Sequence, residues 1–293
     1  MPSRRFPVLS ILGAALMCVA HPQLSSAQPL PPIQDEVKQV LIPMELLANR
    51  PLVRAMVNGQ GPIAFLIVPD ARRTLIDPEL AEALKIHRQG SAAFEAPVEL
   101  TFPKHTVKTT AAVEDIGRYV ADVPAAVRPR GVLSLSAFGE QLVTLDYPRW
   151  KLTIEPGTLE EPNGKNVFPL TNTLELRLPL VIADQSIDCI VDPLFPGDLT
   201  VPASALVGDA PRLARDVGVM RTPSGLRRVR ELKLATTATL GPFQLKSPLL
   251  LLVTDTADGA RIGAPWLGRY EVTYDLAHER IRIDRVSAGI TRQ

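Results

Sequence analysis

The sequence repeats itself once, and this duplication constrains the fold more than any other feature. Residues 143–146 read Val-Thr-Leu-Asp, and residues 272–275 read Val-Thr-Tyr-Asp. Upstream, the run at 65–70 (Phe-Leu-Ile-Val-Pro-Asp) is matched by the run at 189–194 (Cys-Ile-Val-Asp-Pro-Leu). The period is about 124 to 129 residues, which predicts two related lobes and excludes a solenoid of short repeats.

The first 27 residues have the pattern of a secretory signal peptide. Arg4 and Arg5 form a basic start, residues 6–20 are mostly apolar, and Ser-Ser-Ala precedes the expected cleavage after Ala27. The apolar run is too short for a spanning helix, so we expect no transmembrane segment in the mature chain. The pattern predicts a periplasmic or secreted protein.

The charge balance excludes several classes of partner. The chain has 32 basic and 31 acidic residues, and the signal peptide removes two arginines and no acids. The mature chain is therefore close to neutral, with no basic footprint for nucleic acid or an anionic membrane. Cys189 is its one remaining cysteine, so an intramolecular disulfide is not expected. The histidines lie apart in the sequence without ligand spacing, so we expect no metal and no cofactor.

Strand patterns dominate what remains. Proline is frequent, with 28 residues, and the runs at 152–154 and 281–283 alternate with the period of half-buried strands. One short helix is indicated at 77–84, with Asp77 as N-cap and Pro78 in the first turn.

Proline and other turn-forming residues between these patterns predict the domain boundaries. The expected segments are an N-terminal tether or edge strand at 28–45, an N-terminal lobe at 46–157, a linker at 158–166 and a C-terminal lobe at 167–293.

Several motifs spread over both lobes carry a family resemblance. They lie at 58–62 (Asn-Gly-Gln-Gly-Pro), 74–78 (Thr-Leu-Ile-Asp-Pro), 190–192 (Ile-Val-Asp), 196–202 (Pro-Gly-Asp-Leu-Thr-Val-Pro) and 263–267 (Gly-Ala-Pro-Trp-Leu). The chain resembles the retropepsin-like and pepsin-like aspartyl proteases, in the fused two-lobe form of exported bacterial proteins. The resemblance implies a mainly β fold of two β-barrel lobes, related by a pseudo-twofold axis around a cleft, with one or two short helices per lobe.

In that family each lobe contributes an Asp-Thr-Gly loop, and the two aspartates activate a water molecule with one of them protonated. The resemblance places the three loop positions at Val68, Pro69 and Asp70 in the first lobe, and at Asp192, Pro193 and Leu194 in the second. Only one of the two aspartates is therefore kept at its expected position.

The substitutions remove the chemistry that the loop needs. Valine can neither accept a proton nor hold a water molecule, and proline has no hydroxyl and no backbone N–H. The resemblance therefore implies a catalytically degenerate protein without appreciable peptidase activity. An alternative is that Asp70 is displaced into the role of partner to Asp192 as an atypical catalytic pair; otherwise it is a turn residue.

Other candidate groups are weaker. The arginines at 221, 227, 228 and 230 (Arg221, Arg227, Arg228, Arg230) lie where the family would place a hairpin lid, and they could hold acidic groups of a peptide or could face solvent. Cys189 is expected to be a buried, inert thiol, and Ser134 stands where the second copy has Gly263.

The leading hypothesis is an exported, inactive aspartyl-protease-like protein that binds an extended peptide or a partner protein in its cleft. The alternative is an active aspartic endopeptidase that uses Asp70 and Asp192. A third possibility is a purely structural protein of the cell envelope.

Overall fold

The computed structural model describes residues 39–86, 95–121, 123–206, 213–222, 225–254 and 259–286. The predicted signal peptide at 1–27, and most of the predicted tether, lie outside these residues. None of the helices in the described ranges is long and apolar enough to cross a membrane.

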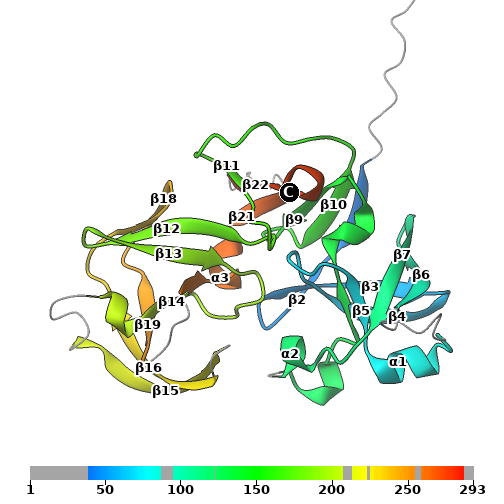
Figure 1. Ribbon diagram of the computed structural model, residues 1–293, viewed down its shortest axis with the longest axis horizontal. Helices are drawn as coiled ribbons and strands as arrows, with labels where there is room; N and C mark the ends of the chain where they lie inside the picture. The colour runs from blue at the N-terminus through cyan, green and yellow to red at the C-terminus, as the bar shows by residue number, and fades with distance from the viewer. Residues whose placement is uncertain are drawn as a thin grey trace, which may run out of the picture. The chain divides into compact units, whose positions relative to one another are not determined.

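The fold is mainly β, as the sequence predicts (Figure 1). The α-helices of the described residues are short: α1 (Pro78–Ala83), α2 (Gly117–Val120) and α3 (Ala264–Leu267). In α1 the Asp77 side chain accepts hydrogen bonds from the amides of Glu79 and Leu80, and Pro78 follows it directly. The predicted helix and its cap are therefore confirmed. Its counterpart in the second half is a 3-10 turn, η3 (Ala203–Ala205).

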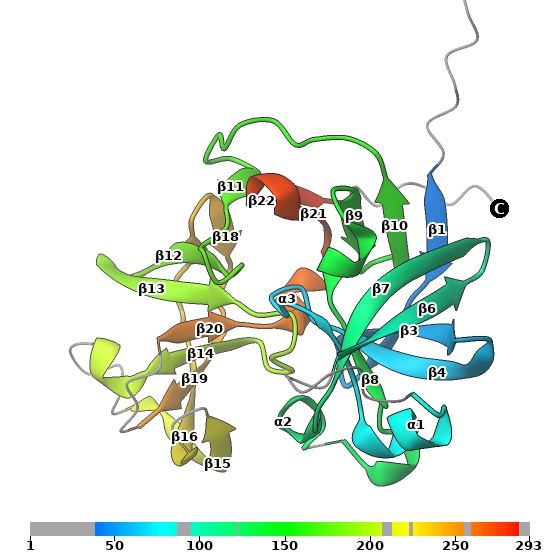
Figure 2. The same cartoon turned by 45° about the vertical axis from the view of Figure 1, so that its right-hand side comes forward.

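The first half of the chain forms a seven-stranded sheet. Its order is β2 (Glu45–Leu47), β3 (Arg50–Val57), β4 (Gln60–Ile67), β8 (Gly131–Leu133), β5 (Thr74–Ile76), β7 (His105–Val113) and β6 (Glu95–Phe102). A further pairing between β3 and β6 joins Met56 to Thr101 and Val57 to Leu100. This pairing closes the sheet into a barrel, whose strands wrap around one another in Figure 2.

The second half forms a nine-stranded sheet. Its order is β15 (Arg215–Thr222), β16 (Gly225–Lys233), β19 (Leu249–Val253), β14 (Leu199–Pro202), β20 (Ala260–Ile262), β13 (Gln185–Val191), β12 (Leu176–Ile182), β17 (Ala238–Leu240) and β18 (Phe243–Leu245). The parallel pair β4–β8 of the first half has its counterpart in the parallel pair β13–β20.

A third sheet is shared between the halves. Its order is β1 (Val40–Pro43), β10 (Lys151–Glu155), β9 (Leu142–Asp146), β21 (Tyr270–Asp275), β22 (Arg280–Arg285) and β11 (Val167–Pro169). The repeated tetrapeptides form its centre, because β9 pairs antiparallel with β21 and Thr144 lies opposite Thr273. Their hydroxyl groups are 2.9 Å apart. Equivalent residues that face each other in this way mark the pseudo-twofold axis.

The connection between the halves has no helix or strand from 156 to 166 but is anchored to the second half. Leu159 is buried, its amide donates to the Asp275 carboxylate at 2.9 Å, and its carbonyl accepts from Arg280 at 2.8 Å.

Candidate functional site

Two equivalent turns follow β4 and β13 and contain the positions that the resemblance identifies. The Val68 amide donates to the Leu133 carbonyl at 3.1 Å, and the Asp192 amide donates to the Ile262 carbonyl at 2.8 Å. Both turns then close in the same way, since the amide three residues later donates back to Val68 or Asp192. Val68 therefore occupies in the first half the place that Asp192 occupies in the second.

Both carboxylate oxygens of Asp192 are engaged by the protein. Oδ1 accepts the Leu194 amide at 2.8 Å, and Oδ2 forms an ion pair with Arg261. Arg261 comes from β20, the strand parallel to β13. The Asp192 side chain is 17% exposed and that of Arg261 28% exposed, so the pair is largely removed from solvent. The Asp192 carboxylate therefore stabilises Arg261 and the backbone of its own turn.

The first half replaces this ion pair with two valines. The strand registers place Leu66 beside Val132 and Ile190 beside Arg261, so Val132 is the counterpart of Arg261. Val68 and Val132 belong to a small apolar cluster, separate from the main core, in which both are 1% exposed or less. Where the second half has an acid and a base, the first half therefore has two valines buried in a hydrophobic cluster.

The same cluster accounts for the second departure in the Asp192 turn. Leu194, at the position of the family's glycine, packs against the cluster from the other half of the chain. A glycine there would leave this contact unmade. The Asp192 turn therefore contributes to packing between the two halves.

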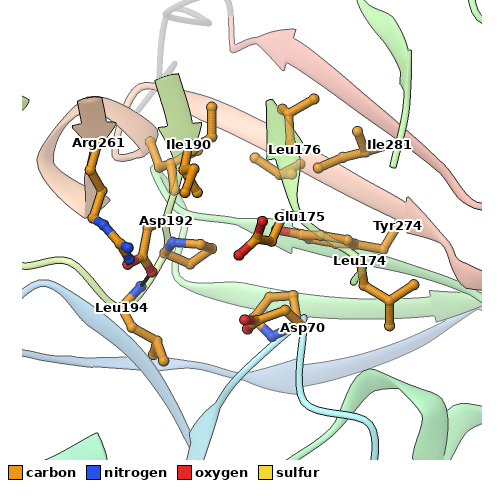
Figure 3. A pocket seen from close by; sticks show the side chains of 15 residues that line it. Asp70, Leu174, Glu175, Leu176, Ile190, Asp192, Leu194, Arg261, Tyr274 and Ile281 are labelled. Carbon is orange, nitrogen blue, oxygen red and sulfur yellow. Dashed lines mark hydrogen bonds and ion pairs between the residues drawn. The ribbon is translucent and has the colours of Figure 1, made fainter. Parts of the chain in front are cut away.

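A pocket of about 160 Å³ opens beside these turns. The described residues that line it come from both halves and are Pro69, Asp70, Leu174, Glu175, Leu176, Ile190, Val191, Asp192, Pro193, Leu194, Arg261, Leu267, Val272, Tyr274 and Ile281. The structure therefore brings the predicted residues Asp70 and Asp192 into one pocket. In Figure 3 the carboxyl groups of Asp70 and Glu175 point into the same part of it, while Asp192 is turned toward Arg261.

Asp70 carries the clearest electrostatic signal among the carboxylates of the pocket. Loss of solvation by the surrounding protein raises the pKa of its carboxyl group, and the negative charge of Asp192 raises it further. Glu175 adds to this effect, and Arg261 opposes it more weakly. Asp70 keeps an exposed surface, so it lies at the open side of the pocket. It therefore takes up a proton more readily than an ordinary aspartate.

Glu175 is a site residue that the sequence analysis missed. Its amide donates to the Thr171 hydroxyl at 3.1 Å, which fixes the loop before β12. One of its oxygens accepts from Arg177 at 2.9 Å, and Arg177 also pairs with Asp188. The sequence holds no motif around Glu175, and its place depends on how the loop folds back over the Asp192 turn.

Two buried tyrosines extend the polar part of the site. Tyr274, on β21, lines the pocket and is 4% exposed, and no hydrogen bond within the described residues includes its hydroxyl. Tyr147 follows β9, is 1% exposed, and its hydroxyl is also without a hydrogen-bond partner in the described part of the chain. Burial raises the pKa of both phenols, and the charge of Asp192 raises it further in each. Both hydroxyls therefore stay protonated.

Of the predicted lid arginines, the three whose side chains are described do not line this pocket. Arg227, Arg228 and Arg230 lie on β16, which pairs with β15 as a hairpin. Arg230 donates to the Ala214 carbonyl at 2.8 Å, and none of the three lines the pocket. The side chain of Arg221 lies outside the described residues. A lid function for this hairpin stays a prediction.

Two further predicted positions have structural roles. Ser134 is fully buried and bonds to the Ala71 carbonyl at 2.6 Å, whereas a side chain at Gly263 would meet the carbonyl oxygens of Phe195 and Gly197. Cys189 is fully buried, and burial raises the pKa of its thiol to about 12. No group of three His, Cys, Asp or Glu residues within the described ranges is placed to hold a metal ion.

Comparison with known proteins finds likeness in structure but not in sequence. No protein-family model and no curated protein matches this chain. Among solved structures, it is similar to basic 7S globulin from soybean, with a TM-score of 0.53 and 12% sequence identity. The match covers 86% of this chain and 96% of the globulin chain. Likeness at this level of identity shows a shared fold and no more.

Proposed function

We propose that this protein is a catalytically inactive relative of the aspartyl proteases that binds a peptide or a protein segment between its two halves. One observation carries the first part. The position equivalent to Asp192 is Val68, which is 1% exposed within an apolar cluster. A water molecule held between two aspartates is the nucleophile of such enzymes, and a buried valine cannot hold it.

The state of Asp192 supports the same conclusion. Its two oxygens are taken by Arg261 and by the Leu194 amide. A carboxylate that is already bound to a guanidinium is a poor general base, because deprotonating a water molecule would require it to leave a favourable ion pair.

Binding is supported by the pocket and its surroundings. The pocket is open, and its lining comes from both halves of the chain. Its walls combine mostly apolar side chains with a few polar and charged groups, a composition typical of ligand sites. An extended peptide suits a site between β sheets because its backbone can pair with strand edges.

A peptidase assay tests the inactive assignment. The purified protein is incubated with a denatured protein substrate from pH 3 to pH 7, beside the variants Asp192→Ala and Asp70→Ala. We expect no cleavage above background in any sample. Cleavage by the native protein that either variant abolishes would refute the proposal.

A second candidate is an active endopeptidase with an atypical pair, and one observation favours it. Asp70 and Asp192 share the pocket, and the charge of Asp192 raises the pKa of Asp70. A protonated acid beside an ionised one is the state that acid–base hydrolysis uses. The assay above separates the two candidates, since this one requires both aspartates.

We also propose export to the periplasm or beyond, which the sequence pattern of residues 1–27 supports. N-terminal sequencing of the protein from its host should give Gln28 as the first residue. An intact N-terminus at Met1 in a cytoplasmic fraction would contradict this.

A further inference from the structure

The polar half of the pocket carries more negative than positive charge. Among the described residues, Asp70, Glu175 and Asp192 line it together with a single cation, Arg261, which is already paired with Asp192. Arg177 is not among the residues that line the pocket, and it forms ion pairs with both Glu175 and Asp188. Asp70 has no such partner among the ion pairs of the described residues.

Tyr274 gives an independent sign of an absent partner. The residue is 4% exposed, it lines the pocket, and its hydroxyl takes part in no hydrogen bond of the described residues. Figure 3 shows it reaching toward the space between Glu175 and Asp70. Buried phenol hydroxyls normally have a partner. A phenol oxygen beside two carboxyl groups offers three acceptors to one donor-rich group.

We propose that this pocket binds a cationic group of the ligand, namely the guanidinium or ammonium group of an arginine or lysine side chain. Asp70 and Glu175 supply the counter-charges and Tyr274 accepts a hydrogen bond. Arg261 stays with Asp192. The apolar residues Leu174, Leu176 and Ile281 contact the methylene groups of the same side chain.

The size of the pocket fits such a group. A volume of about 160 Å³ is close to that of an engineered cavity of about 150 Å³ that holds benzene in another protein. A planar guanidinium with its adjoining methylene groups is of similar bulk. The inference rests on the proposed ligand binding and specifies which chemistry the site selects.

The test compares two blocked amino acids that differ in charge and little in shape. N-acetyl-arginine methylamide and N-acetyl-citrulline methylamide are titrated into the purified protein by calorimetry at pH 7. Charge-assisted hydrogen bonds are roughly twice as strong as neutral ones. We therefore expect arginine to bind at least about tenfold more tightly than citrulline.

Isosteric variants locate the effect. Asp70→Asn and Glu175→Gln should each reduce the preference for arginine to about threefold or less, and Tyr274→Phe should weaken binding of both probes. Asp188→Asn is the matched control, because Asp188 shares Arg177 with Glu175 but does not line the pocket. It should keep the full preference. Thermal unfolding establishes that each variant is folded.

The outcomes separate this inference from the proposed function. Six-residue blocked peptides with a central arginine or citrulline are titrated in the same way. If both peptides bind equally well, the cation site is refuted while peptide binding stands. If the single arginine binds selectively and the longer peptide adds nothing, the cation site stands and peptide binding is refuted. Equal binding of the two amino-acid probes, or a preference unchanged by Asp70→Asn, also overturns the inference.

Discussion

Asp70 is the residue whose ionisation is most closely tied to the pocket. The pKa of its carboxyl group is raised in the folded protein by lost solvation and by Asp192. The native state therefore holds this proton more tightly than the unfolded state, and stability falls as the pH rises above the ordinary aspartate pKa of about 3.9.

Replacing Asp70 with asparagine should remove this cost. We expect Asp70→Asn to raise the melting temperature at pH 7 and to have little effect near pH 3, where the native carboxyl is already protonated. Calorimetric melting curves across this range measure the difference. Glu140→Gln, at an exposed site outside the pocket, should change neither value. A gain that does not depend on pH would contradict this explanation.

Cys189 should be inert for as long as the protein is folded. Burial raises the pKa of its thiol to about 12, and the thiolate is the reactive form. In a Cys18→Ser background, a thiol reagent such as DTNB should react with less than about one tenth of the protein at pH 8, and with all of it in denaturant. Fast labelling of the native protein would show that the strand is open.

At the level of elements, the paired threonines hold β9 against β21. Thr144 and Thr273 are both buried, and their hydroxyls bond at 2.9 Å. The Thr273 hydroxyl also accepts a hydrogen bond from the Arg282 guanidinium group at 3.3 Å. A single Thr→Val change leaves the other hydroxyl with fewer partners and should cost about 1–3 kcal/mol.

The double variant, Thr144→Val with Thr273→Val, should cost less than the sum of the two single changes. Replacing both partners by apolar groups of the same shape leaves neither hydroxyl unpaired. Arg282 loses its Thr273 acceptor in the double variant, but it already does so in Thr273→Val alone. Urea unfolding of all four proteins gives the coupling energy. Strict additivity would show that the two hydroxyls do not interact.

Ser134 and Gly263 occupy equivalent positions in the two halves, and we expect substitutions at them to lower stability for different reasons. A Cβ atom at position 263 would overlap with the carbonyl oxygens of Phe195 and Gly197. Gly263→Ser should therefore destabilise by the upper end of the roughly 1–3 kcal/mol that overpacking costs, or more. Ser134→Ala should cost about 1–3 kcal/mol through its lost hydrogen bonds. Chemical denaturation measures both, and a tolerated serine at 263 would show that this backbone contact is loose.

The sequence predicted these elements well where the duplication was visible. The alternating runs at 152–154 and 281–283 predicted strands that the structure has as β10 and β22, and Asp77 with Pro78 predicted the start of α1. Glu175 could not be predicted, because its carboxylate reaches the pocket through a loop that has no repeated motif. The role of Arg261 could not be predicted either. Its partnership with Asp192 depends on a parallel pairing between strands about 70 residues apart in sequence.

For the molecule as a whole, the shared six-stranded sheet should keep the halves together without a covalent link. The sheet takes β1, β9 and β10 from the first half and β11, β21 and β22 from the second. A protease site inserted between Glu160 and Glu161, where the Glu161 side chain is 82% exposed, allows the connection to be cut. We expect the two fragments to elute together in native gel filtration.

Disrupting the central strand pair provides the control for this experiment. Thr273→Pro removes a backbone donor from β21 in the middle of the sheet. The cut protein with this change should separate or aggregate. Fragments that separate without it would show that the connection itself holds the halves together.

The valines at positions 68 and 132 also limit how the site can change under selection. An aspartate at 68 alone would enter a place that is 1% exposed and lined by apolar side chains, where an uncompensated charge is costly. An arginine at 132 alone would meet the same penalty. An aspartate at position 68 therefore requires coupled substitutions in the surrounding cluster. Single mutations are for this reason a poor route back to an acid in each half.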